Sequence, residues 1–216
     1  MTPKEASRQA REIAALAPII PVLVIEDAAR AEGLARALVA GGLPALEVTL
    51  RTPAALDAIR AMAAVPGGVV GAGTLLTPED VAAAKAAGAR FGVSPGATDR
   101  LLDAAEALDL PMLAGAATAT EAMRLFERGY DFMKFFPAEA SGGAAALKAL
   151  AAPLPAIAFC PTGGVSLANA RDYLSLPNVL CAGGSWVAPA AMARSGDWAG
   201  IEALAREAAM LERGAR

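Results

Sequence analysis

The chain has 216 residues, a formal net charge of −3 and a composition that is 56% hydrophobic, with no histidine. This length fits one folded domain near the lower size limit of a complete (β/α)8 barrel. The lack of histidine excludes Ser-His-Asp and Cys-His catalysis and histidine-rich zinc sites, and no run of Lys or Arg forms the basic stripe of a nucleic-acid binder.

Short apolar segments bounded by Gly and Pro alternate with Ala-rich segments of helical length, a pattern typical of repeated βα units. The first predicted element is a helix within residues 1–16, over about 4–16, which is expected to close the bottom of a barrel. Strands are then expected at 19–24, 43–50, 69–72, 91–93, 112–114, 132–136, 157–160 and 179–182. Helices are expected at about 27–40, 53–64, 77–87, 98–108, 118–128, 142–151, 166–174 and 188–211, the last interrupted near Gly196.

Residues that commonly begin and end helices support these boundaries. Thr52 and Thr77 each precede a proline, and Thr118 or Thr120 precedes Glu121, so each of these positions is expected to start a helix. Glycines 41, 88 and 129 are expected to end helices.

Eight βα units favour a single-domain (β/α)8 TIM barrel over residues 1–216, although a doubly wound open sheet has similar local patterns. The uncharged stretch 149–170 is interrupted by prolines and glycines, which argues against a membrane span. The N-terminal segment lacks the apolar core of a signal peptide, so a cytoplasmic location is expected. The buried-looking Cys160 and Cys181 are read as reduced structural thiols.

Lys134 lies within the strand at 132–136, whereas the other lysines fall in helical segments. Burying an ammonium group between apolar neighbours is unfavourable unless the group is paired or loses its proton. That cost favours an amine nucleophile, because desolvation activates lysine. A lysine that reaches solvent from the strand end is the alternative.

The predicted second strand carries Glu47, Thr49 and Arg51 at alternating positions, so their side chains share one face. One interpretation is a proton-shuttling Glu47 beside an Arg51 that binds a substrate carboxylate through its bidentate fork. The other is an internal ion pair that fills the barrel.

Small and polar residues follow four further strands. Thr74 and Pro95 follow the third and fourth strands, where ordinary turns are the alternative interpretation. Paired glycines follow the seventh and eighth strands, in Pro161-Thr162-Gly163-Gly164 and in Gly183-Gly184-Ser185-Trp186. Barrels commonly bind phosphate at these two loops through backbone N–H groups, although tight turns alone also use such pairs.

Taken together, these motifs resemble the 2-keto-3-deoxy-6-phosphogluconate (KDPG) and 4-hydroxy-2-oxoglutarate (KHG) aldolases. The resemblance covers almost the full chain and is carried by LEVTLRT (46–52), GAGT (71–74), SPG (94–96), KFFPAE (134–139), PTGG (161–164) and GGSW (183–186). It implies a homotrimeric (β/α)8 barrel of the Entner–Doudoroff pathway that needs no metal or cofactor and reversibly cleaves a phosphorylated keto-acid to pyruvate and glyceraldehyde 3-phosphate.

The resemblance also implies a role for each matching residue. Lys134 would form the Schiff base, with Glu47 as general acid and base. Substrate would contact Arg51, Thr74, Pro95, Phe136, Thr162, Gly163, Gly164, Gly183, Gly184 and Ser185. Two competing hypotheses remain: a phosphosugar epimerase or decarboxylase on the same barrel, and a non-catalytic phosphosugar-binding protein.

Overall fold

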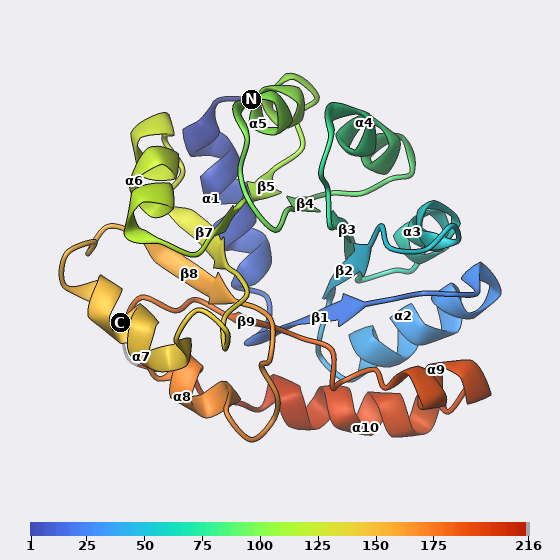
Figure 1. Cartoon of the computed structure of the whole chain (residues 1–216). Coiled ribbons are helices and arrows are strands. Elements are labelled where there is room, and N and C mark those ends of the chain that lie inside the picture. Colours follow the sequence, from blue (N-terminus) through green and yellow to red (C-terminus); the bar gives the residue numbers. More distant parts are fainter. Residues whose placement is uncertain (215–216) are drawn as a thin grey trace.

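The computed structural model describes residues 1–214, and strands alternate with helices along this part of the chain (Figure 1). The last two residues of the predicted domain, 215–216, lie outside the described residues. The strands are β1 (Ile19–Leu23), β2 (Ala45–Thr49), β3 (Val69–Gly73), β4 (Gly92–Val93), β5 (Met112–Leu113), β6 (Gly115–Ala116), β7 (Phe132–Phe135), β8 (Ala158–Pro161) and β9 (Ala182–Gly184). The helices are α1 (Pro3–Ala14), the 3-10 helix η1 (Ala28–Arg30), α2 (Ala31–Ala40), α3 (Ala55–Ala63), α4 (Pro78–Ala86), α5 (Asp99–Ala107), α6 (Ala119–Arg128), α7 (Gly143–Ala151), α8 (Ala170–Leu174), α9 (Ala190–Ser195) and α10 (Trp198–Ala209).

The strands form two parallel sheets, whereas the sequence predicted one eight-stranded sheet. The larger sheet has six strands in the order β5-β4-β3-β2-β1-β9, and the smaller has three in the order β6-β7-β8. The division falls at Ala114, because Met112 and Leu113 pair with β4 while the Ala114 carbonyl accepts a hydrogen bond from the amide of Lys134 on β7. This is an α/β fold with one curled parallel sheet and a second, smaller parallel sheet.

The predicted last strand was placed too early in the chain. The structure places it at Ala182–Gly184, and Val179 forms an isolated bridge with Phe159 ahead of this strand. The carbonyl of Pro18 accepts a hydrogen bond from the amide of Ala182, so the strand begins where it can pair with β1.

Two hydrophobic clusters hold the fold together. The larger lies between strands and helices and includes Leu46 and Val48, as the alternating pattern of the second strand predicted. Helices α2 to α8 and α10 surround the strands in Figure 1, and α10 lies beside α2. The smaller cluster, here called the inner cluster, consists of Ala10, Ala14, Ile20, Ala45, Phe91, Val93, Leu113, Phe132, Cys160, Leu180 and Cys181.

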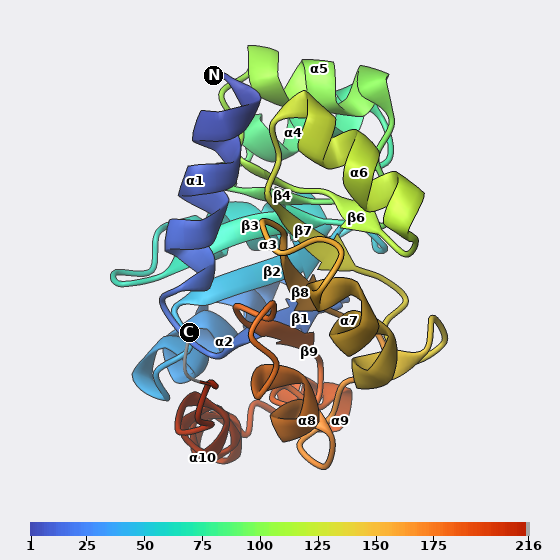
Figure 2. The same ribbon diagram turned by 90° about the vertical axis from the view of Figure 1, so that its left-hand side faces the viewer.

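Helix α1 lies at the edge where β7 begins (Figure 2). The hydroxyl of Ser7 accepts hydrogen bonds from the amides of Asp131 and Phe132, and it donates one to the Asp131 carboxylate at 2.6 Å. Arg11 donates to the same carboxylate at 2.9 Å. These bonds fasten α1 to the beginning of the strand that carries Lys134.

The helix starts agree with the sequence at two places and differ at one. Thr77 and Thr118 form capping boxes with Asp80 and Glu121, respectively. Thr52 caps no helix, because α3 begins later, at Ala55, and the Thr52 hydroxyl donates instead to the carbonyl of Ile25.

The predicted helix ends hold with small shifts. Gly129 ends α6 in the left-handed conformation, and Gly196 separates α9 from α10 as expected.

Among the helices of residues 1–214, none combines the length and apolar character needed to cross a membrane.

Candidate active site

Lys134 and Glu47 meet in the interior, although they come from strands in different sheets. Lys134 on β7 is 4% exposed and Glu47 on β2 is 2% exposed. The Lys134 Nζ lies 3.4 Å from the Glu47 Oε1, at the outer limit of a hydrogen bond. At this separation the two groups offset the cost of each other's burial, and both lie where they can exchange protons with a molecule bound beside them.

The position of Glu47 depends on the neighbouring strand. β2 and β3 pair in parallel, with Glu47 opposite Gly71 and Thr49 opposite Gly73. A Cβ atom at Gly73 would lie 2.2 Å from the Glu47 Oε1, a distance that real Cβ atoms essentially never show. The carboxylate therefore occupies space that only glycine leaves open.

Arg51 and Thr74 form a second polar pair beyond the ends of β2 and β3. The Arg51 Nε donates to the Thr74 Oγ1 at 3.2 Å, and the arginine side chain is otherwise exposed. Thr74 has a φ of 61°, unusual for a residue other than glycine. Strained backbone of this kind often occurs at functional sites. Thr49 takes no part in this pair, because its hydroxyl donates to the carbonyl of Leu23.

Phe136 joins the lysine to the glycine loop that follows β8. The Lys134 Nζ lies 5.0 Å from the centre of the Phe136 ring, within cation–π range. A carbon of the same ring lies 3.3 Å from where a Cβ of Gly163 would be. One aromatic side chain thus borders both the amine and the loop.

The two paired-glycine loops adjoin one another. Thr162 and Gly183 form a parallel bridge, and a Cβ at Gly183 would lie 2.3 Å from the Thr162 Oγ1. Gly163 and Gly164 have φ values of 100° and 80°. Within residues 1–214, their backbone N–H groups have no hydrogen-bond acceptor, which leaves both available to an anion.

The remaining predicted contact residues border this region. Gly184 packs against the indole of Trp186, because a Cβ there would lie 1.7 Å from a ring carbon. Ser185 follows it and is exposed. The Pro95 carbonyl lies 2.2 Å from where a Cβ of Gly115 would be, and Gly115 is paired with Lys134. Pro95 is therefore one strand away from the lysine.

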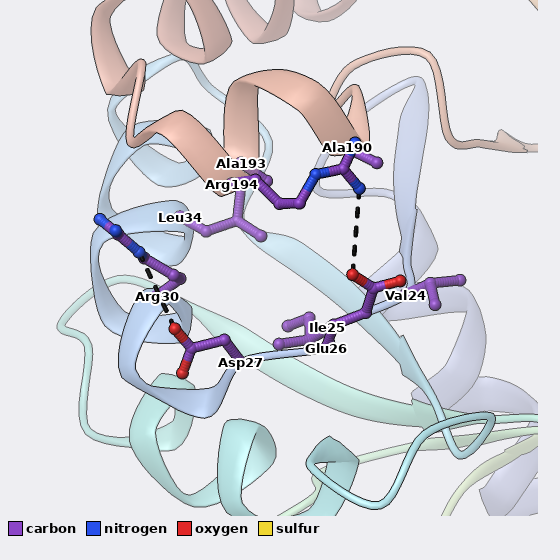
Figure 3. Close-up of a pocket in the computed structure, with 9 residues that line it drawn as sticks. All are labelled: Val24, Ile25, Glu26, Asp27, Arg30, Leu34, Ala190, Ala193 and Arg194. Atoms are coloured by element: carbon purple, nitrogen blue, oxygen red, sulfur yellow. Dashed lines mark ion pairs between the residues drawn. The ribbon is translucent and has the colours of Figure 1, made fainter.

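A separate hollow of about 360 Å³ lies between α9 and the segment that joins β1 to η1 (Figure 3). It is lined by Val24, Ile25, Glu26, Asp27, Arg30, Leu34, Ala190, Ala193 and Arg194. Its charged groups pair with one another, Arg30 with Asp27 and Arg194 with Glu26, each at 3.9 Å. None of the predicted site residues lines it.

Sequence reasoning missed three residues that shape the site. Gly73 belongs to the GAGT segment, but its position opposite Thr49 is visible only in the structure. Glu139 belongs to the KFFPAE segment, and Tyr173 had no indication at all, yet the Tyr173 hydroxyl donates to the Glu139 carboxylate behind the Gly163–Gly164 loop. Within residues 1–214, no group of three or more His, Cys, Asp or Glu side chains is placed to hold a metal ion.

Comparison with known proteins connects this geometry to one family. The sequence model of the family described as "KDPG and KHG aldolase" matches residues 10–204. The 2-dehydro-3-deoxy-phosphogluconate aldolase of Pseudoalteromonas atlantica is 53% identical over 192 residues, which cover 88% of this chain and 89% of that protein. The KHG/KDPG aldolase of Escherichia coli K12 is 50% identical over 200 residues, covering 92% and 94%.

Solved structures agree with this relationship. The 2-keto-3-deoxy-6-phosphogluconate aldolase of Zymomonas mobilis with 3-phosphoglycerate has a TM-score of 0.92 and 50% identity, covering 96% of this chain and 98% of that one. The KDPG aldolase of Legionella pneumophila, with pyruvate captured as a covalent carbinolamine intermediate, has a TM-score of 0.89 and 43% identity, covering 92% and 97%.

Proposed function

Because this chain belongs to the KDPG and KHG aldolase family, we propose that it reversibly cleaves 2-keto-3-deoxy-6-phosphogluconate into pyruvate and glyceraldehyde 3-phosphate. The observation that carries this proposal is the buried pair of Lys134 and Glu47, 3.4 Å apart. An amine and a carboxylate in one enclosed site are the two groups that Schiff-base chemistry requires.

The reaction begins when the neutral amine of Lys134 attacks the C2 carbonyl of the keto-acid and forms a carbinolamine. Loss of water gives an iminium ion, which accepts the electrons of the C3–C4 bond when that bond breaks. A proton leaves the C4 hydroxyl, and the aldehyde departs. The enamine that remains is protonated at C3, and water then hydrolyses the imine to release pyruvate and the free lysine.

Glu47 carries the protons in these steps. Its carboxylic acid form donates to the departing carbinolamine hydroxyl, and its carboxylate form accepts the proton from the C4 hydroxyl. Its place beside the Lys134 Nζ supports both roles, because a substrate carbon bonded to that nitrogen would lie close to the same carboxylate.

The groups around this pair bind the rest of the substrate. Arg51 with Thr74 holds the pyruvate carboxylate, and Phe136 and Pro95 bound the pocket around the reacting carbons. The distal hydroxyls and phosphate lie against the paired-glycine loops, at Thr162, Gly163, Gly164, Gly183, Gly184 and Ser185. The unpartnered amides of Gly163 and Gly164 support this placement.

A coupled assay of pyruvate release from 2-keto-3-deoxy-6-phosphogluconate, with and without EDTA, tests the proposal. Equal release in both conditions is expected, because the lysine replaces the metal as the electron sink. No release, or release abolished by EDTA, would favour the epimerase, decarboxylase or metal-dependent alternatives. We also propose cleavage of 4-hydroxy-2-oxoglutarate to pyruvate and glyoxylate, since the Escherichia coli relative carries both activities in its name.

We further infer that the two sheets belong to one (β/α)8 barrel domain, with α1 across its base. Two observations support closure: Ala114 alone separates β5 from β6, and isolated bridges connect β8 to the segment around β9. The inner cluster, with α1 residues Ala10 and Ala14 in it, is then the filling of the barrel.

We also propose a cytoplasmic homotrimer, on the family resemblance. Light scattering should give three times the 21.7 kDa of the chain. A mass equal to that of one chain would contradict it.

A further inference from the structure

We propose that Tyr173 and Glu139 are positioning residues that set the selectivity for a phosphorylated aldehyde over an unphosphorylated one. This inference rests on the proposed function, because it assigns a support to the phosphate site at Gly163 and Gly164. Within residues 1–214, neither side chain forms a hydrogen bond with Lys134 or Glu47.

Tyr173 is a buried phenol whose polar end reaches one carboxylate. It lies on α8 with 1% exposure, and its hydroxyl donates to the Glu139 Oε1. Burial, and next the neighbouring carboxylate, raise the pKa of the Tyr173 hydroxyl well above its usual value. The phenol therefore stays protonated and keeps donating across the working pH range.

Glu139 in turn packs directly against the glycine loop. Its backbone N–H donates to the carbonyl of Gly163 at 3.1 Å. A Cβ at Gly164 would lie 2.4 Å from the Glu139 Cγ, so the side chain of Glu139 lies against the Cα of Gly164. A glutamate held in place by Tyr173 therefore limits how far this loop can move.

The loop is fastened from its other side by Asn169. The Asn169 Nδ2 donates to the carbonyl of Gly164 at 3.1 Å, and its Oδ1 accepts from the amide of Ser166 at 2.8 Å. Both glycines adopt the left-handed conformation and have no side chain of their own to pack, so the path of the loop depends on contacts of this kind. Together they hold the unpartnered amides of Gly163 and Gly164 in a fixed direction, which is what binding an anion by backbone requires.

The experiment runs the aldol reaction with pyruvate and compares kcat/KM for D-glyceraldehyde 3-phosphate with kcat/KM for D-glyceraldehyde. Tyr173→Phe and Glu139→Ala should each lower the ratio by about tenfold, the effect of losing one hydrogen bond to a charged group. The decrease in kcat/KM should be confined to the phosphorylated aldehyde and should arise mainly from a higher KM. Glu139→Gln keeps an acceptor for Tyr173 and should retain most of the ratio.

Tyr130→Phe is a matched control. Tyr130 is also fully buried, and its hydroxyl donates to the Glu106 carboxylate at 3.0 Å. It lies just before β7 begins, at the opposite edge from the glycine loops. Its loss should lower stability without moving the selectivity ratio.

A parallel fall for both aldehydes in Tyr173→Phe and Glu139→Ala, or a ratio no different from that of Tyr130→Phe, would overturn the inference. Borohydride trapping with pyruvate on the wild type separates this result from failure of the proposed function. A wild type that forms no pyruvate adduct contradicts the aldolase assignment itself. One that forms the adduct but does not prefer the phosphorylated aldehyde contradicts the phosphate site and this inference alone.

Discussion

The carboxylate of Glu47 lies in the space beside Gly73 that a side chain would otherwise fill. An added Cβ at Gly73 would come within 2.2 Å of Oε1 and 2.7 Å of Cγ. Both contacts involve a side chain that is only 2% exposed. The glycine at this position of β3 thus determines where the carboxylate of Glu47, the proposed general acid and base, lies.

Gly73→Ala should therefore lower kcat by about a hundredfold or more, as expected when a general acid and base is displaced. The fold should survive, because the glutamate can shift toward Lys134. Gly68→Ala is the matched control, since its added Cβ would meet only ordinary contacts, at 3.4 Å from the Val65 carbonyl oxygen. Equal kcat for the Gly73 and Gly68 variants would show that Glu47 tolerates displacement.

Glu47→Gln should separate imine formation from proton transfer. The amide keeps the size of the side chain but cannot carry a proton, so turnover should fall by about 10² to 10⁴-fold while slow imine formation continues. Single-turnover kinetics with pyruvate and borohydride measures the imine step, and steady-state pyruvate release measures the whole cycle. Normal turnover would remove Glu47 from its proposed role.

Arg51→Lys should weaken pyruvate binding although the charge is kept. An ammonium group does not reproduce the planar fork that grips a carboxylate at two points, and it would also lose the Nε contact to Thr74. An affinity loss of about tenfold is expected. Pyruvate affinity is measured from the rate of borohydride inactivation at rising pyruvate concentration, because only the pyruvate imine is reduced. An unchanged affinity would place the carboxylate elsewhere.

Asp131→Asn tests how α1 is fastened to β7. Burial alone would raise the pKa of Asp131, but hydrogen bonds from Arg11 and Ser7 outweigh it, and the net pKa is lowered. A lowered folded pKa means that the carboxylate stabilises the fold above the unfolded pKa of about 3.9 and loses this effect as the pH falls further.

The variant should thus be less stable at neutral pH by about 1 kcal/mol, a value discounted for solvent exposure. This corresponds to a Tm lower by about 3 °C for a chain of this length. The gap should shrink as the pH drops below about 4. A gap that is constant from pH 7 to about pH 3 would show that the charge of Asp131 contributes nothing.

Much of the fold could be predicted from local pattern. The alternation of Leu46 and Val48 with Glu47 identified the second strand and its inward face, and Thr77 and Thr118 marked helix starts. The break at Ala114 could not be predicted, because it depends on which neighbouring strand accepts each backbone hydrogen bond. The predicted helix start at Thr52 was wrong for a similar reason, because the Thr52 hydroxyl donates a hydrogen bond to the carbonyl of Ile25 on a different segment.

Candidate site residues could be predicted where a charged side chain occurs in an apolar segment. A lysine in the apolar strand at 132–136 stands out from the sequence alone, and the structure places Glu47 beside it. Supporting residues were not visible, because their importance lies in contacts between distant segments. Tyr173 and Glu139 are separated by 34 positions, and nothing in either neighbourhood indicates that they meet.

The most direct measurement is the mass of the protein after reduction with borohydride in the presence of pyruvate, followed by peptide mapping. We expect one reduced pyruvate per chain on Lys134 and no adduct in Lys134→Ala. The adduct should be unchanged in Lys148→Ala, because Lys148 is a control lysine exposed on α7. An adduct on another lysine, or none on the wild type, would contradict the claim that Lys134 is the Schiff-base residue.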